Sequence, residues 1–194
     1  MTRKVKNHYD TISAFIKSIR GSDPQAAVYW LARMLLAGED IKFIARRMII
    51  LASEDIGLAN PTALVLANNC FQAIQVTGMP EARIVLSQTA LYLACSAKSN
   101  SAYKAINEAM SVAGKDLSNV VPLHLRNAPS ELMKSFDYGK DYRYSHAYQG
   151  NFVEQEYLPN ELKGHTFYIP GVNKREQQMR EEQLQLWKNK YDLK

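Results

Sequence analysis

The sequence predicts an all-α protein, with a bundle of about six helices, an irregular aromatic-rich segment and a C-terminal helix. Residues 7–114 carry apolar side chains at three- and four-residue intervals, which is the helical period. Gly, Pro and Asn interrupt this pattern often enough to separate helices of about three to four turns. The content of hydrophobic residues is 46%, which is ordinary for a globular protein.

Single residues mark where the predicted helices begin and end. Asp23 precedes Pro24, so a second helix is expected to begin there with a side-chain cap and to stop at Gly38. A third is expected to begin near Asp40. The fourth, fifth and sixth are expected to begin at Asn60-Pro61, at Pro80 and at Ser99 or Asn100. The helical bundle is therefore predicted to span residues 1–114.

The remaining chain has a different composition. Residues 115–172 are rich in proline, glycine and tyrosine, and contain one predicted short helix from Pro129 to Phe136. Because tyrosine can pack while its hydroxyl stays hydrogen-bonded, we expect this irregular segment to pack on the bundle as part of the same domain. Residues 173–194 are predicted to form a polar C-terminal helix in contact with solvent.

Net charge and cysteine content indicate which partners and which redox compartment suit the protein. The chain has 24 Lys and Arg against 19 Asp and Glu, a net charge of +5 that is spread along the sequence. Such a dispersed excess tolerates a DNA neighbour but does not indicate one. Cys70 and Cys95 both fall in apolar helical segments, so we expect two buried free thiols, as in the reducing cytoplasm.

Motifs for catalysis are missing from the sequence. It contains no G-x-x-x-x-G-K-[ST] loop, no G-x-G-x-x-G turn and no G-x-S-x-G elbow. The four histidines are far apart and lack a metal-ligand spacing with either cysteine: His8, His124, His146 and His165. We therefore predict no catalytic, cofactor-binding or metal-binding residue, and no enzyme activity in this chain alone.

The centre of the sequence is nearly without charge. Between Ile56 and Ala97 the only charged residues are Glu81 and Arg83. On the fourth predicted helix, one face carries the amides Asn68, Gln72 and Gln75, with Asn69 beside them. Two explanations remain open: these helices are central in one bundle, or their uncharged faces meet another subunit. The four amides are the candidate oligomer interface.

Two groups of basic residues are candidates for DNA contact. Lys42 and Arg46 share a helix face, with Arg47 adjacent, and Lys140 and Arg143 lie among tyrosines. A solvated helix face explains the first group equally well, and packing of the aromatic segment explains the second. The alternative to an assembly domain is thus a free-standing nucleic-acid-binding helical module.

Several strings of residues resemble a known family over nearly the whole chain. They are Ser18-Ile19-Arg20-Gly21-Ser22-Asp23-Pro24, Tyr29-Trp30-Leu31-Ala32-Arg33-Met34, Ala52-Ser53-Glu54-Asp55-Ile56-Gly57-Leu58-Ala59, Lys98-Ser99-Asn100, Val121-Pro122-Leu123-His124-Leu125-Arg126-Asn127-Ala128-Pro129, Tyr138-Gly139-Lys140 and Glu156-Tyr157-Leu158-Pro159. In these strings the chain resembles the C-terminal, oligomerisation domain of the RarA/MgsA family of AAA+ replication-associated recombination ATPases, relatives of the Werner-helicase-interacting protein.

The resemblance implies a function in assembly. It implies a homotetramer that holds ATPase modules around DNA at stalled replication forks, in DNA replication and recombinational repair. It also implies that ATP and Mg²⁺ bind in an N-terminal module, so that the chain is a fragment with Met1 supplied for expression. DNA, single-strand-binding protein and other replication proteins are the implied partners of the full-length protein, in the cytoplasm near the nucleoid and without a membrane.

Overall fold

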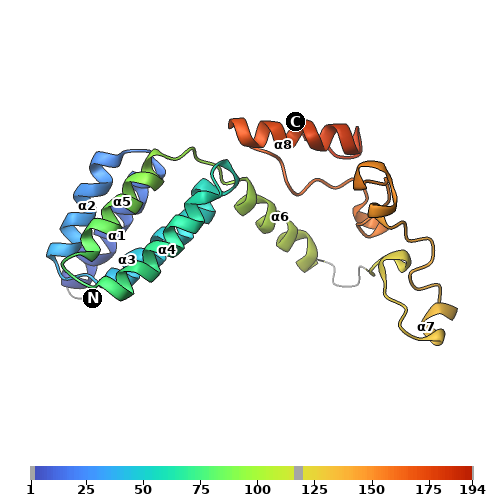
Figure 1. Ribbon diagram of the computed structural model, residues 1–194, viewed down its shortest axis with the longest axis horizontal. Coiled ribbons are helices and arrows are strands. Elements are labelled where there is room, and N and C mark those ends of the chain that lie inside the picture. The colour runs from blue at the N-terminus through green and yellow to red at the C-terminus, as the bar shows by residue number, and fades with distance from the viewer. Residues whose placement is uncertain (1–2, 116–119, 194) are drawn as a thin grey trace. The chain divides into compact units, whose positions relative to one another are not determined.

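The computed structural model describes the backbone of residues 3–115 and 120–193 and the side chains from Tyr9 onward. Within this part every regular element is a helix (Figure 1), which confirms the predicted all-α class. The α-helices are α1 (Arg3–Arg20), α2 (Pro24–Leu36), α3 (Ile41–Leu51), α4 (Thr62–Thr77), α5 (Ala82–Cys95), α6 (Ser101–Lys115), α7 (Glu131–Ser135) and α8 (Lys174–Trp187). A π-helical turn, η1 (Ala52–Ile56), extends α3, and the 3-10 turns are η2 (Gly57–Ala59), η3 (Leu123–Leu125), η4 (Ser145–Ala147), η5 (Gln149–Asn151) and η6 (Asn160–Leu162).

Contacts divide the chain into two compact units. The first unit comprises Met1–Lys104 and Pro170–Gln177, and the second comprises Ala105–Ile169 and Gln178–Lys194. Along the sequence, the chain passes from one unit to the other at three places: inside α6, between Ile169 and Pro170 before α8 begins, and inside α8. Packing of residues 115–172 on the bundle stays a prediction.

Helix starts in the first unit follow the capping residues seen in the sequence. The Asp23 carboxylate accepts a hydrogen bond from the backbone N–H of Ala26 at 2.9 Å, at the start of α2. Asp40 does the same for the N–H of Lys42 at 2.9 Å, at the start of α3. These bonds satisfy backbone donors that have no partner inside the helix. The predicted starts of α2 and α3 are therefore confirmed.

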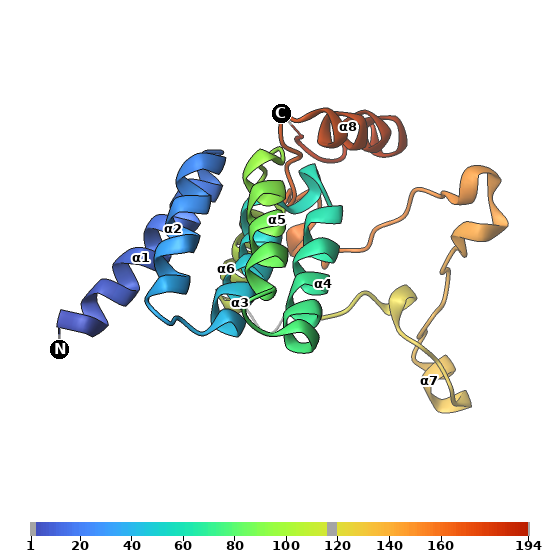
Figure 2. The ribbon, with the colours of Figure 1, turned by 60° about the vertical axis from the view of Figure 1, so that its left-hand side comes forward.

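The helices of the first unit form two layers. Helix α5 packs between α2 and α4, and these three make one layer (Figure 2). Helices α1 and α3 make the other layer and pack against the inner side of the first. The core lies between the layers and is formed by apolar side chains from all five helices, among them Phe15, Leu31, Met48, Ile74 and Leu86. We call α2, α5 and α4 together the α2–α5–α4 layer.

The turn after α3 connects three parts of the first unit. Asp55 in η1 receives a hydrogen bond of 2.6 Å from the Arg20 guanidinium at the end of α1. Its backbone carbonyl accepts a bond of 2.8 Å from the N–H of Ser99. Gly57 follows with φ at +49°, and a Cβ there would lie 3.1 Å from the Ser99 carbonyl oxygen. A glycine is therefore required where this turn passes the α5–α6 connection.

The second unit has a small core. Among its described apolar side chains, only Val153 and Leu193 are buried. Aromatic contacts hold the unit instead, because the Trp187 ring packs edge-on against Phe152 at 5.0 Å and Tyr191 at 5.6 Å between ring centroids. The Lys190 ammonium lies 4.4 Å from the centre of the Trp187 ring. The predicted short helix of this region is confirmed as α7.

Candidate protein-interaction surface

The four candidate amides lie together on the outward side of α4. Asn68, Asn69, Gln72 and Gln75 are all exposed, while Ala63, Ala67, Cys70 and Ile74 of the same helix are buried. Of the two explanations left open by the sequence, burial of these amides inside the bundle is thereby excluded. Their contact with another subunit stays a prediction.

Apolar side chains that sequence reasoning did not assign to this surface surround the amides. Leu64, Val65 and Val76 are exposed on the same helix, with 88% of Val76 accessible. Helix α4 contains no Asp, Glu, Lys or Arg. The signal was present in the sequence, since at 100° per residue these positions fall within an arc of about 140°. We call Leu64, Val65, Asn68, Asn69, Gln72, Gln75 and Val76 the α4 face.

The neighbouring helices continue the uncharged surface. On α5, Ile84, Gln88 and Leu91 are exposed. A groove of about 500 Å³ runs between α2 and α5, and Arg83 is the one charged residue among those that line it: Val28, Leu31, Ala32, Leu35, Arg83, Ile84, Ser87 and Gln88. Exposed apolar patches rimmed by polar groups are typical of protein-interaction sites. The outward side of the α2–α5–α4 layer therefore has the chemistry of an interface.

The predicted basic residues of α3 lie on the other layer. Lys42 and Arg46 are both exposed, and Arg46 lies 3.8 Å from the Asp40 carboxylate. Arg47 is half-buried, and its buried Nε has no hydrogen-bond partner among the described residues. The structure thus places Lys42 and Arg46 together in solvent and sets Arg47 apart from them. DNA contact by these residues stays a prediction.

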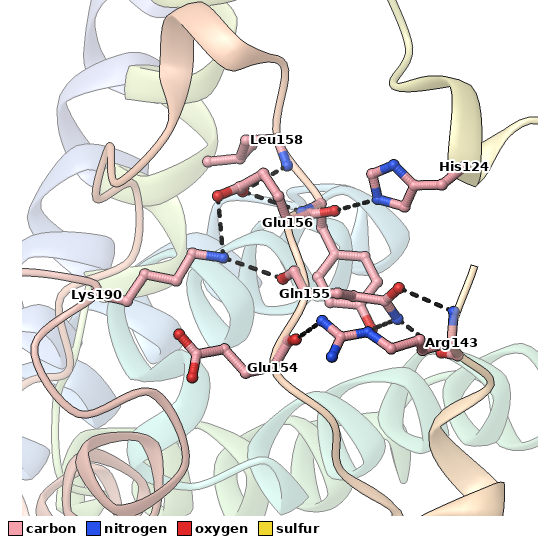
Figure 3. A network of polar contacts seen from close by, with 8 residues as sticks. His124, Arg143, Glu154, Gln155, Glu156, Leu158 and Lys190 are labelled. Atoms are coloured by element: carbon pink, nitrogen blue, oxygen red, sulfur yellow. Dashed lines mark hydrogen bonds and ion pairs between the residues drawn. The ribbon is translucent and has the colours of Figure 1, made fainter. Parts of the chain in front are cut away.

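In the second unit, Lys140 and Arg143 both have partners within the chain. The Lys140 ammonium lies 2.9 Å from the Asp137 carboxylate, and this hydrogen bond raises the pKa of Lys140. The Arg143 guanidinium donates to the Glu154 carbonyl (Figure 3), and the Gln155 amide donates to the Arg143 carbonyl at 2.8 Å. Both side chains therefore have partners within the chain, and their contact with DNA stays a prediction.

A polar network near Arg143 holds the irregular segment around Glu156 in place. The Lys190 ammonium lies 3.3 Å from the Glu156 carboxylate, which also accepts a bond from the N–H of Leu158 at 3.0 Å (Figure 3). Burial raises the pKa of Glu156, but these donors outweigh it and the net pKa is lowered. His124 Nε2 lies 2.7 Å from the Glu156 carbonyl oxygen. The network explains why irregular chain is ordered here.

A second polar cluster, in the first unit, was missed by the sequence analysis. Glu176 is fully buried, and its carboxylate accepts hydrogen bonds from the Ser101 hydroxyl and from the Asn173 amide. Asn173 in turn accepts a bond of 3.0 Å from the N–H of Glu176, a reciprocal pair like a capping box at the start of α8. Ser99 also donates to the carboxylate. We call Ser99, Ser101, Gly171, Asn173 and Glu176 the Glu176 clasp.

The clasp keeps its carboxylate ionised. Burial raises the pKa of Glu176, yet the hydrogen bonds from Ser101, Ser99, the Gly171 backbone and Asn173 together lower it to about 2. Gly171 is needed because a Cβ at this position would lie 2.8 Å from Glu176 Oε2. Glu176 is thus buried in the first unit, while most described side chains of the polar C-terminal helix are exposed, as the sequence predicts.

One thiol also differs from expectation. Both cysteines are free, but Cys70 is buried while Cys95 is exposed. Cys95 is the last residue of α5 and lies on the outward side with Leu91, so an apolar segment did not imply burial. Within the described ranges, no helix is both long and apolar enough to cross a membrane.

Together, the helical layers define an all-α domain with a largely uncharged surface on the outward side of one layer. The chain matches the family described as MgsA AAA+ ATPase C terminal over residues 21–187, and it belongs to this family. The resemblance found in the sequence is thereby confirmed.

Curated relatives include proteins named for replication and recombination and one named as an ATPase. Over 163 residues the chain is 50% identical to "Replication-associated recombination protein A" of Coxiella burnetii, covering 84% of this chain and 37% of that protein. The protein of the same name in Escherichia coli K12 is 42% identical over 163 residues, with 84% and 36% covered. "ATPase WRNIP1" of Dictyostelium discoideum is 45% identical over 175 residues, with 87% and 20% covered. The chain thus spans 20–37% of the length of these relatives.

Proposed function

We propose that this chain is the oligomerisation domain of an AAA+ DNA-dependent ATPase that acts at stalled replication forks, in DNA replication and recombinational repair. The names of the relatives support a function in replication and recombination. Since the chain spans little more than a third of its bacterial relatives, the activity of the whole protein belongs to this proposal.

The observation that carries the proposal is the uncharged outward side of the α2–α5–α4 layer. Its three helices contain only two charged residues, Arg33 and Arg83. A surface helix of a monomer normally carries a charged face, whereas the centre of an interface is depleted in charge. Leu36 and Val76 are each 88% exposed, so a single copy leaves these apolar side chains in water. Association of copies through this surface would remove them from water.

The second unit gives further support. Only Val153 and Leu193 are buried among its described apolar side chains, while Met110, Leu132 and Phe136 are exposed. Such a ratio is unusual for an independent domain and common where neighbouring subunits complete the core. We therefore propose that both units contribute to assembly.

In the proposed assembly, four copies hold their ATPase modules around DNA. ATP and Mg²⁺ are bound by the N-terminal module of the full-length protein, and this chain contributes no cofactor site. DNA, single-strand-binding protein and other replication proteins are the proposed partners of the complete protein, in the cytoplasm at the nucleoid. Arg143 and Lys140 have partners within the chain, which favours assembly over a nucleic-acid-binding module.

The proposal is tested by introducing charged residues on the α4 face. The double variant Asn68→Arg/Gln72→Arg places guanidinium groups on two exposed residues, so the monomer should keep its fold. We expect sedimentation to show a fall from tetramer to dimer or monomer, because buried like charges repel across an interface. Lys42→Ala/Arg46→Ala, on the opposite layer, is the control and should leave the mass unchanged. An unchanged tetramer in the α4 variant would exclude this face.

A further inference from the structure

The α4 face has the spacing of a helix-pairing seam. Val65, Asn68, Gln72 and Gln75 follow one another at intervals of three, four and three residues, and all four are exposed. Residues at alternating intervals of three and four lie on a narrow stripe along a helix, as at the contact line of two paired helices. Leu64, Asn69 and Val76 flank this stripe. The seam runs along most of α4, which is about 24 Å long.

The seam carries amides at two positions that are symmetric about its middle, 68 and 72. Asn68 and Gln72 lie at equal distances before and after residue 70, and so do Val65 and Gln75, and Leu64 and Val76. If two copies of α4 are laid antiparallel with residue 70 at the centre, Asn68 faces the partner's Gln72. Leu64 then lies level with the partner's Val76, on opposite edges of the contact. The amides at positions 68 and 72 therefore allow the face to bind its own copy.

Amide chemistry suits such a self-pairing. A carboxamide is both donor and acceptor, so one amide can bond another without a complementary charged partner. A charged group near a two-fold axis would meet its own like charge. Antiparallel pairing is favoured over parallel pairing because the dipoles of the two helices then oppose each other. Helix α4 has no charged residue, which is compatible with this geometry.

We propose that two copies of this chain pair through their α4 faces, antiparallel and about a two-fold axis near residue 70, with Asn68 of each copy bonding the partner's Gln72. This inference rests on the proposed assembly function and narrows it to an isologous contact. Such a contact uses the same face on both copies and leaves the α2–α5 groove uncovered. A tetramer would therefore need a second, different contact.

Two charge variants of the seam test the pairing. In Asn68→Lys/Gln72→Lys, each new ammonium faces an ammonium of the partner, and the self-association constant should fall at least tenfold. In Asn68→Glu/Gln72→Lys, the carboxylate at position 68 faces the partner's ammonium at position 72, so association should persist at low salt. It should then weaken towards about 0.5 M salt, where exposed charges are screened. Sedimentation equilibrium measures both, and circular dichroism verifies that helicity is kept.

The outcomes separate this inference from the function it rests on. Loss of association in both variants would overturn the antiparallel register, since a parallel contact sets each position against itself and so brings like charges together in each variant. An unchanged self-association constant in both variants would show that the interface lies outside the α4 face, and the proposed assembly function would still stand. A monomeric unmodified chain would overturn the assembly function itself, and the pairing with it.

Disulfide trapping tests the register without added charge. Chains with Asn68→Cys and chains with Gln72→Cys, each also carrying Cys95→Ser, are mixed and oxidised. The antiparallel register predicts a cross-linked heterodimer from the mixture and none from either chain alone, because a disulfide forms only between close Cβ atoms. A cross-link in either chain alone would show parallel pairing and overturn the proposal.

Discussion

Replacing Glu176 by glutamine should destabilise the first unit at neutral pH. The carboxylate is fully buried and accepts hydrogen bonds from Ser101 and Asn173. Glutamine keeps the shape but carries no charge, and one end of its amide would present N–H groups to donors. A buried donor without an acceptor costs about 1–3 kcal/mol, and more where a charged acceptor is lost.

The magnitude follows from the pKa of Glu176. Its ordinary value is 4.5, and in the folded protein the pKa is about 2. Because folding lowers the pKa, the ionised group stabilises the fold fully above pH 4.5, and this contribution is lost as the pH falls from 4.5 to about 2. At about 1.4 kcal/mol per pKa unit, the difference amounts to about 3 kcal/mol at neutral pH and about 1 kcal/mol at pH 3.

Urea unfolding at fixed protein concentration, followed by circular dichroism, measures this effect. Glu176→Gln should lower the free energy of unfolding by about 3 kcal/mol at pH 7 and by about 1 kcal/mol at pH 3. An equal loss at both pH values would show that the clasp acts through packing rather than through its charge. A variant as stable as the unmodified chain at pH 7 would refute the reasoning altogether.

Three further changes have expected outcomes. Gly171→Ala should lower the free energy of unfolding by about 1–3 kcal/mol, because the new Cβ meets Glu176 Oε2 at 2.8 Å, and an unchanged melting temperature would contradict this. Trp187→Ala removes the centre of the aromatic contacts in the second unit, so residues 120–169 should be cleaved faster by protease; equal cleavage rates would speak against that role. Single-stranded DNA should bind weakly and be released by about 0.3 M salt, more readily still in Lys42→Ala/Arg46→Ala. A DNA complex that survives this salt concentration would favour the nucleic-acid-binding module.

Local signals in the sequence determined what could be predicted of the fold. Asp23, Pro24 and Asp40 act within three residues of their own position, so the helix starts they mark follow from the sequence alone. The outward side of α4 was also readable, because the helical period places Asn68 and Gln72 on one side whatever the rest of the chain does.

Features that depend on distant residues were not readable in this way. Asn173 and Glu176 have the spacing of a helix cap, but burial of Glu176 depends on Ser101, which is 75 residues away. Cys95 lies in an apolar stretch, yet it occupies the outward side of α5 because α5 packs between α2 and α4. In both cases a long-range contact decides burial, and the local pattern carries no information about it.

Assembly through an uncharged helical layer is the central claim, and the mass of the chain in solution tests it most directly. Sedimentation equilibrium of the unmodified 194-residue chain at low micromolar concentration is the measurement. The exposed apolar and amide side chains of the α2–α5–α4 layer predict association of copies, and the proposed tetramer would have about four times the 22.0 kDa of one copy. A single species at 22.0 kDa would contradict it.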